Sequence, residues 1–154
     1  MAPETSTQRP TPIIVAGKTE TIGKGVIDRL KPEYEVVHFV IGPEAAISEV
    51  PVILNGQIPP NPSSTLGSGN LSERPVAFAL GGAFAETFDQ VHDEVEKEFG
   101  ASGSGLAWLR HDWSTPAPPL GPEYADAIVQ RIKDRLAQLK ADGKLGGQTD
   151  VYLF

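Results

Sequence analysis

Cysteine is absent from this chain of 154 residues, and basic residues are scarce. Without cysteine the chain can form no disulfides, thiolate nucleophiles or cysteine-bound zinc and iron–sulfur clusters. The 13 lysine and arginine residues are outnumbered by 20 aspartate and glutamate residues, which gives a net charge of −7. This charge repels phosphate polymers and anionic lipids, so we expect neither nucleic acid nor a membrane as a partner.

Long apolar runs are also missing. No run reaches the roughly 18 residues that a membrane span needs, and the first residues are too polar for a secretory leader, so we expect a cytoplasmic protein. Residues 1–11 lack hydrophobic periodicity and predict a disordered N-terminal arm. Residues 12–154 are enough for one domain with a substantial core.

Four short segments are largely apolar, as is typical of strands buried in a parallel sheet, and the first is also rich in β-branched side chains. They are residues 12–16, 34–41, 75–80 and 106–109. Other segments carry apolar residues at helical spacing and end near proline or glycine. These helical segments are residues 22–30, 88–99 and 122–143.

The alternation of strands and helices, without hairpin signals, predicts an α/β fold: a three-layer α/β/α sandwich around a parallel sheet of four strands. We expect the strand order 2-1-3-4. Residues 43–54 fit either a short helix or two turns, because Pro51 interrupts them. The apolar tail, residues 151–154, predicts an additional edge strand or a contact with a second subunit, and hence a homodimer.

Residues 56–74 are rich in proline, glycine and serine and predict a long loop, which in compact domains is often a lid or a disordered segment. In parallel sheets, ligands bind outside the carboxyl ends of the strands, where the strand order reverses. That rule brings four segments to one edge of the sheet. They are residues 17–21, 41–43, 81–84 and 110–114.

A glycine-containing turn follows the first predicted strand and opens a helix. Its residues Gly17, Lys18, Thr19, Thr21 and Gly23 resemble the G-x-T-G-x-x-G turn of atypical short-chain dehydrogenases and NmrA-like proteins, which have a Rossmann-like fold. The resemblance implies that these residues bind NADP(H) or NAD, with Gly17 in the tight turn and Gly23 in a close helix–strand contact. The free N–H groups at the start of the helix would favour a phosphate.

Three features depart from that family. Glu20 stands where the family has a glycine against the pyrophosphate, and it adds like charge there. Only Glu44 is available to read a ribose after the second strand, and no tyrosine has a lysine four residues later, so the catalytic pair of short-chain reductases is absent. The loop is therefore degenerate and its cofactor unknown, with FMN as an alternative. A second likeness, over Leu109–Tyr124, is to short fungal proteins with the same order of elements.

His111 and Asp112 follow the fourth predicted strand and are the candidate catalytic residues, as general base and neighbouring acid. The alternative is structural, because adjacent residues on an extended chain point to opposite sides and Asp112 could pair with an arginine. Substrate contacts are expected from Gly81, Gly82, Arg110 and Trp113.

The other two histidines have plainer interpretations. His38 lies inside an apolar strand, where a neutral imidazole bonded to the backbone is expected. His92 and Glu96 are one helical turn apart, but two ligands without a third do not make a metal site, so we expect no metal.

Two functions remain open at this point. The first is a small-molecule or nucleotide-binding Rossmann-like protein with a degenerate glycine loop. The second is a non-redox enzyme, such as an isomerase, dehydratase or hydrolase, that uses His111 and Asp112 beneath the loop of residues 56–74. A scaffold held together by the C-terminal tail is a third alternative.

Overall fold

The computed structural model describes residues 9–119, 121–146 and 149–154. Its strands are β1 (Thr11–Gly17), β2 (Tyr34–Ile41), β3 (Ala77–Leu80), β4 (Ala107–Arg110) and β5 (Asp150–Leu153). Its helices are α1 (Glu20–Leu30), α2 (Pro43–Leu54), α3 (Phe88–Lys97) and α4 (Pro122–Ala141), with short 3-10 helices η2 (Gly82–Phe84) and η3 (Gly100–Ser102). Most of the predicted disordered arm lies outside the described residues, and Thr11 already belongs to β1.

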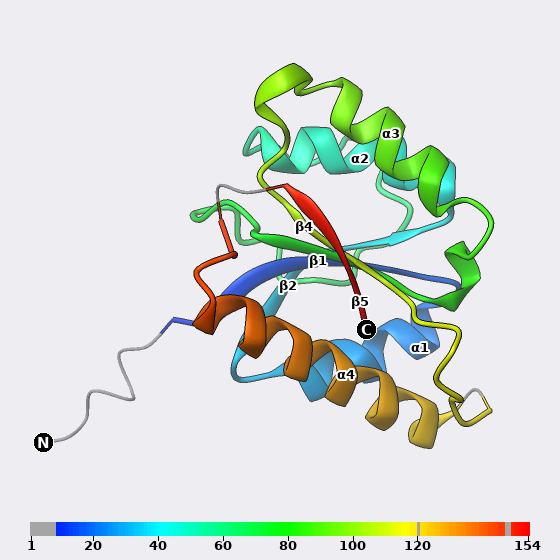
Figure 1. Cartoon of the computed structure of the whole chain (residues 1–154). Helices are drawn as coiled ribbons and strands as arrows, with labels where there is room; N and C mark the ends of the chain where they lie inside the picture. Colours follow the sequence, from blue (N-terminus) through cyan, green and yellow to red (C-terminus); the bar gives the residue numbers. More distant parts are fainter. Residues whose placement is uncertain (1–8, 120, 147–148) are drawn as a thin grey trace, which may run out of the picture.

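All neighbouring strands are parallel, in the order β2-β1-β3-β4-β5. In Figure 1, α1 and α4 cover one face of the sheet, and α2 and α3 cover the other. The predicted α/β class, parallel sheet and order of the first four strands are confirmed. The sheet has one strand more than the four predicted, because the tail pairs with β4 as the additional edge strand.

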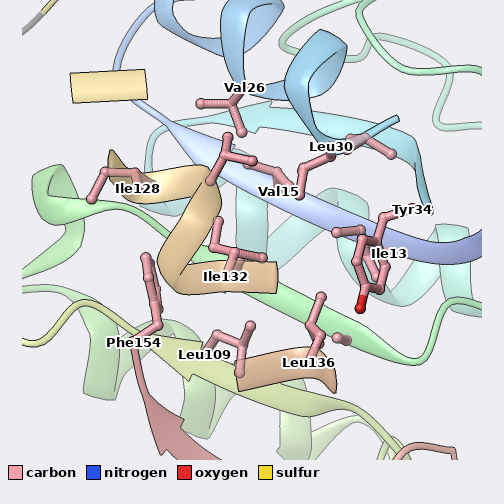
Figure 2. Close-up of a cluster of buried hydrophobic side chains, with 14 of the residues drawn as sticks. Ile13, Val15, Val26, Leu30, Tyr34, Leu109, Ile128, Ile132, Leu136 and Phe154 are labelled. Atoms are coloured by element: carbon pink, nitrogen blue, oxygen red, sulfur yellow. The ribbon is translucent and has the colours of Figure 1, made fainter. Parts of the chain in front are cut away.

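The sheet separates two cores. Ile13 and Val15 of β1 face the core beneath α1 and α4, whereas the alternate residues Ile14 and Ala16 face the core beneath α2 and α3. This two-sided burial explains why the strands are continuously apolar. Phe154 is buried in the first core beside α4 (Figure 2), so the tail is anchored in the domain itself.

The segment whose structure stayed open in the sequence forms one helix, α2. Gly42 precedes it with a φ of 93°, a conformation that favours glycine, and Pro43 occupies its first turn, where a missing N–H costs nothing. Pro51 lies near the end of the helix. A proline there removes one backbone hydrogen bond, and the burial of Val50 and Ile53 against the sheet offsets that loss.

The loop between α2 and β3 lies along the outer edge of β2. The amides of Ser68 and Gly69 donate to the carbonyls of Val36 and Val37, at 2.9 and 3.0 Å. This pairing covers backbone groups of an edge strand that would otherwise be open. The loop lies beside β2, α2 and the start of α1, and β1 and β3 stand between β2 and β4, the strand that leads to His111; a role as a lid stays a prediction.

A buried carboxylate fixes the start of this loop. Glu49 of α2 accepts a hydrogen bond from the amide of Ser63 at 2.8 Å, and its other oxygen lies 2.7 Å from Nε2 of His38. His38 is buried, as expected, but the prediction of a backbone partner is wrong. The pair ties β2, α2 and the loop together.

Candidate functional site

A cavity of about 630 Å³ lies at the carboxyl ends of β1 and β3 and extends between the sheet and helices α1 and α4. Its mouth is formed by parts of the segments that the parallel topology was expected to gather. They are Gly17–Thr19, Ile41–Pro43, Gly81–Phe84 and Trp113. Its inner wall is apolar, with Phe39, Ile128, Ile132 and Phe154 among its side chains. We call this cavity the α1–α4 pocket.

The two glycines of the predicted nucleotide loop make room for a side chain. A Cβ atom on Gly23 would lie 2.6 Å from Cζ of Phe39, and one on Gly17 would lie 3.0 Å from the same atom. Distances below 3.0 Å are sterically excluded for a rigid buried ring. Neither glycine has a positive φ. Gly23 therefore makes the close helix–strand contact that the resemblance implies, and Gly17 lies at the limit of contact with the same ring.

The polar residues of this loop point in different directions. Thr19 caps α1, with its hydroxyl oxygen accepting from the amide of Ile22 at 3.3 Å. Lys18 lines the pocket, whereas Thr21 is exposed and lies outside its lining. The carboxylate of Glu20 accepts a hydrogen bond from Ser64 at 2.6 Å, so it is held by the loop between α2 and β3.

Gly81 and Gly82 lie at the mouth, with the indole of Trp113 packed on Gly82. A Cβ on Gly82 would meet that indole at 3.0 Å, so the glycine allows the close approach. Tyr124, which the sequence analysis missed, lines the same part of the pocket. Burial raises the pKa of its hydroxyl, and the backbone of Gly82 and the charge of Arg131 oppose this. The sequence did offer a sign of this position, because Tyr124 is four residues before Ile128 and so lies on the same face of the predicted helix.

His111 is 6% exposed and lies directly behind the pocket. Its ring is 4.4 Å from that of Trp113 and 5.8 Å from that of Phe154, both of which line the pocket. Burial and the charge of Arg131 lower the pKa of His111, with a smaller opposing effect from Asp112. The imidazole is therefore held neutral and can act as a base.

The structure does not bring His111 and Asp112 together as a hydrogen-bonded pair. The Asp112 carboxylate accepts from the amide and the hydroxyl of Ser114, at 2.9 and 2.6 Å, and these bonds lower its pKa. Arg110 also lies apart from the pocket. Its guanidinium pairs with Asp89 at 3.2 Å and stacks over Phe88 on the α3 side of the sheet.

His92 and Glu96 contribute to packing beneath α3. The His92 ring lies 4.9 Å from that of Trp108, and the Glu96 carboxylate accepts from the Trp108 indole N–H at 2.8 Å and from Ser104. Within the described ranges, no group of three potential ligands could hold a metal ion. No helix there is both long and apolar enough to cross a membrane.

Comparison with known proteins gives one informative likeness. No model of a known protein family matches the chain, so the NmrA-like family is not confirmed, and no solved structure matches either. Kojic acid related protein 6 of Aspergillus oryzae is 35% identical over 134 residues, which cover 86% of this chain and 79% of the relative. On the strength of this likeness over most of both sequences, the chain belongs to the family of kojic acid related protein 6.

Proposed function

We propose that the protein binds a small, largely apolar molecule in the α1–α4 pocket. The observation that carries this proposal is the cavity of about 630 Å³ at the carboxyl edge of the sheet. Pockets for small ligands fall in the range of about 300–1,000 Å³ and combine apolar walls with a few polar groups. Here Lys18 and Tyr124 supply those polar groups.

Three features favour a small molecule over a dinucleotide as the ligand. Phe39 fills the space beside Gly17 and Gly23, and the Thr19 hydroxyl is committed to capping α1. Glu20 places a carboxylate at the first turn of that helix. NADPH, NADH and FMN therefore belong in the experiment as competing ligands, and the cofactor stays open. The name of the relative connects that protein with kojic acid, which we include as a further probe.

Filling the pocket tests the proposal. Ala79 of β3 lines the cavity, whereas Ala77, two residues earlier on the same face, lies in closely packed core. We expect Ala79→Leu to weaken binding of any hit from this panel and from a library of small aromatic compounds by at least about tenfold, or 1.4 kcal/mol. Calorimetry measures this directly.

The matched control is Ala77→Leu, which should leave the affinity unchanged. It should instead destabilise the fold by about 1–3 kcal/mol, because the core at this position has no room for extra methylenes. Equal affinities in wild type and Ala79→Leu would show that the ligand binds elsewhere. If no compound binds the wild type, the proposal is rejected.

A second candidate function is a non-redox enzyme with His111 as its base. The observation in its favour is the buried imidazole of His111, whose pKa is lowered and whose ring packs against Trp113 in the pocket wall. Proton transfer needs the substrate within hydrogen-bond reach of the ring, and so needs Trp113 to move. Turnover of a bound ligand that disappears in His111→Gln, while its affinity persists, would support this candidate over binding alone.

A further inference from the structure

Two buried nitrogen atoms beside the α1–α4 pocket lack hydrogen-bond partners among the described residues. They are Nδ1 of His111 and Nη1 of Arg131. An unsatisfied buried polar atom costs about 1–3 kcal/mol, and more when the group is charged. Two such atoms behind one pocket wall indicate a site for a hydrogen-bond acceptor.

Both groups lie beside the wall of the pocket and are not among the residues that line it. His111 packs against Trp113 and Phe154, and Arg131 lies on α4 immediately before Ile132; these three neighbours all line the cavity. The charge of Arg131 also shifts the pKa of Tyr124, another lining residue. The guanidinium therefore acts on the same region that a ligand would enter.

Arg131 has no carboxylate partner in the part of the chain that the structure describes. Its Nη2 donates to the carbonyls of Thr115 and Pro116. These bonds hold the guanidinium against the segment between β4 and α4. Asp112, whose pKa the charge of Arg131 also lowers, is bonded to Ser114 instead. Because Nη2 already donates to two carbonyls, the unpaired Nη1 is the group that can bind a carboxylate, through a charge-assisted hydrogen bond.

His111 complements this chemistry. A neutral imidazole can carry its proton on Nδ1 and donate it to an anion. No aspartate or glutamate lines the pocket, and the charge of Asp112, which acts on both His111 and Arg131, is partly offset by its bonds to Ser114.

Trp113 lies between the ring of His111 and the cavity. Its side chain is 64% exposed and rests on the bare backbone of Gly82 and on the ring of His111. A large exposed indole buries little surface in this position, so its displacement costs little free energy.

Building on the proposed small-molecule pocket, we propose that its ligand is a small apolar acid. The apolar body occupies the cavity between the sheet and α4, and the carboxylate or enolate is bound by Arg131 and His111 behind the displaced indole of Trp113.

The test compares two probes of the same shape, 2-naphthoate and the neutral 2-naphthamide, by calorimetry and by Trp113 fluorescence. We expect wild-type protein to bind the acid at least about tenfold more tightly than the amide. Arg131→Gln should abolish this preference and leave amide binding unchanged, which also shows that the variant is folded. Arg131→Lys should restore part of the preference, because it keeps the charge but loses the planar fork.

Lys24→Gln is the matched control, since it removes an exposed lysine of α1 outside the pocket lining and should retain the preference, whereas Lys18→Gln tests the competing cation at the mouth of the pocket. A preference lost in Lys18→Gln and kept in Arg131→Gln would contradict the inference. Equal binding of acid and amide by wild type would also reject it while leaving the pocket's binding function intact. Failure of both probes to bind would count against the proposed function and this inference together.

Discussion

At the scale of single residues, Phe39 changes the meaning of the glycine turn. Sequence patterns locate positions where a Cβ is excluded, but they do not say what occupies the space. A phosphate and an aromatic ring both require that absence. Here the ring of Phe39 lies within 3.0 Å of where both Cβ atoms would be. The packing of β2 against α1 is therefore a sufficient reason for Gly23, and phosphate binding beside Gly17 stays a prediction.

His111 makes the stability of the protein depend on pH. Burial and Arg131 lower its pKa in the folded state, while Asp112 opposes them more weakly. The unfolded chain then binds a proton more readily than the folded one, so stability is complete above the unfolded pKa of about 6.5 and is lost as the pH falls below it. We expect the urea midpoint to fall more steeply between about pH 7.5 and pH 5.5 in wild type than in His111→Gln.

Parallel slopes in wild type and His111→Gln would show that burial of His111 does not couple folding to protonation.

At the scale of elements, local patterns predicted the strands and helices well where burial is two-sided. The segments of β1 and β2 are continuous apolar runs, and a run of that kind has few alternatives. α2 stayed ambiguous because Pro51 opposes a helix locally, whereas burial against the sheet decides the outcome. The path of the loop between α2 and β3 was not predictable, since it depends on the distant acceptor Glu49.

The Glu49 carboxylate allows a direct test of how that loop is held. Glu49→Gln keeps one oxygen for the Ser63 amide and replaces the other by an NH₂ group, which cannot accept a hydrogen bond from a His38 ring that donates from Nε2. We expect a loss of about 1–3 kcal/mol in the free energy of unfolding. Hydrogen exchange should accelerate at the amides of Ser63, Ser68 and Gly69.

Glu44→Gln is the matched control, because Glu44 is exposed in the first turn of the same helix. It should change stability by a few tenths of a kcal/mol at most. Faster exchange over the whole domain in Glu49→Gln, rather than in the loop, would mean that this pair supports the global fold and not the loop.

The part of the candidate site that lies at the carboxyl ends of the strands could be predicted from the sequence, because the order of the strands alone determines it. The carboxyl ends of parallel strands meet at one edge, so Gly17, Gly81 and Trp113 could be grouped from sequence. The inner wall from α4 and the tail could not, because it depends on how α4 docks on the sheet. The directions of two side chains were not predictable either. Arg110 turns toward Asp89, which is distant in the sequence, and Asp112 accepts a hydrogen bond from Ser114 in a local turn.

At the scale of the whole molecule, the two faces of the sheet differ in packing. The α2–α3 face is closed by aromatic contacts, with the Phe78 and Trp108 rings 5.2 Å apart and those of Phe88 and Trp108 5.9 Å apart. The pocket opens mainly beneath α1 and α4. A ligand in it adds contacts between the helices and the sheet, so binding should raise the stability of the entire domain.

The open edge of the sheet carries the last prediction, which concerns the proposed homodimer. The backbone N–H and C=O groups of Tyr152, in β5, and of Phe154, directly after it, point toward β4. Those of the alternate residues Val151 and Leu153 therefore point toward the open edge of the sheet. Two of these are already bonded: the Val151 amide donates to the Asp150 carboxylate, and the Leu153 carbonyl accepts from Arg135. The side chains of Val151 and Leu153 are 37% and 46% exposed.

Two copies could pair their β5 strands antiparallel through this edge. The Val151 amide and the Leu153 carbonyl would then have to give up their present partners and bond to the other chain. We therefore expect weak, concentration-dependent dimerisation in sedimentation experiments, strengthened in Asp150→Ala because the Val151 amide is released. Leu153→Lys should abolish it, since like charges would face each other across the two-fold axis and an edge lysine opposes strand pairing. Dimerisation that is insensitive to both substitutions would place the interface elsewhere, and a strictly monomeric Asp150→Ala variant would contradict association through β5.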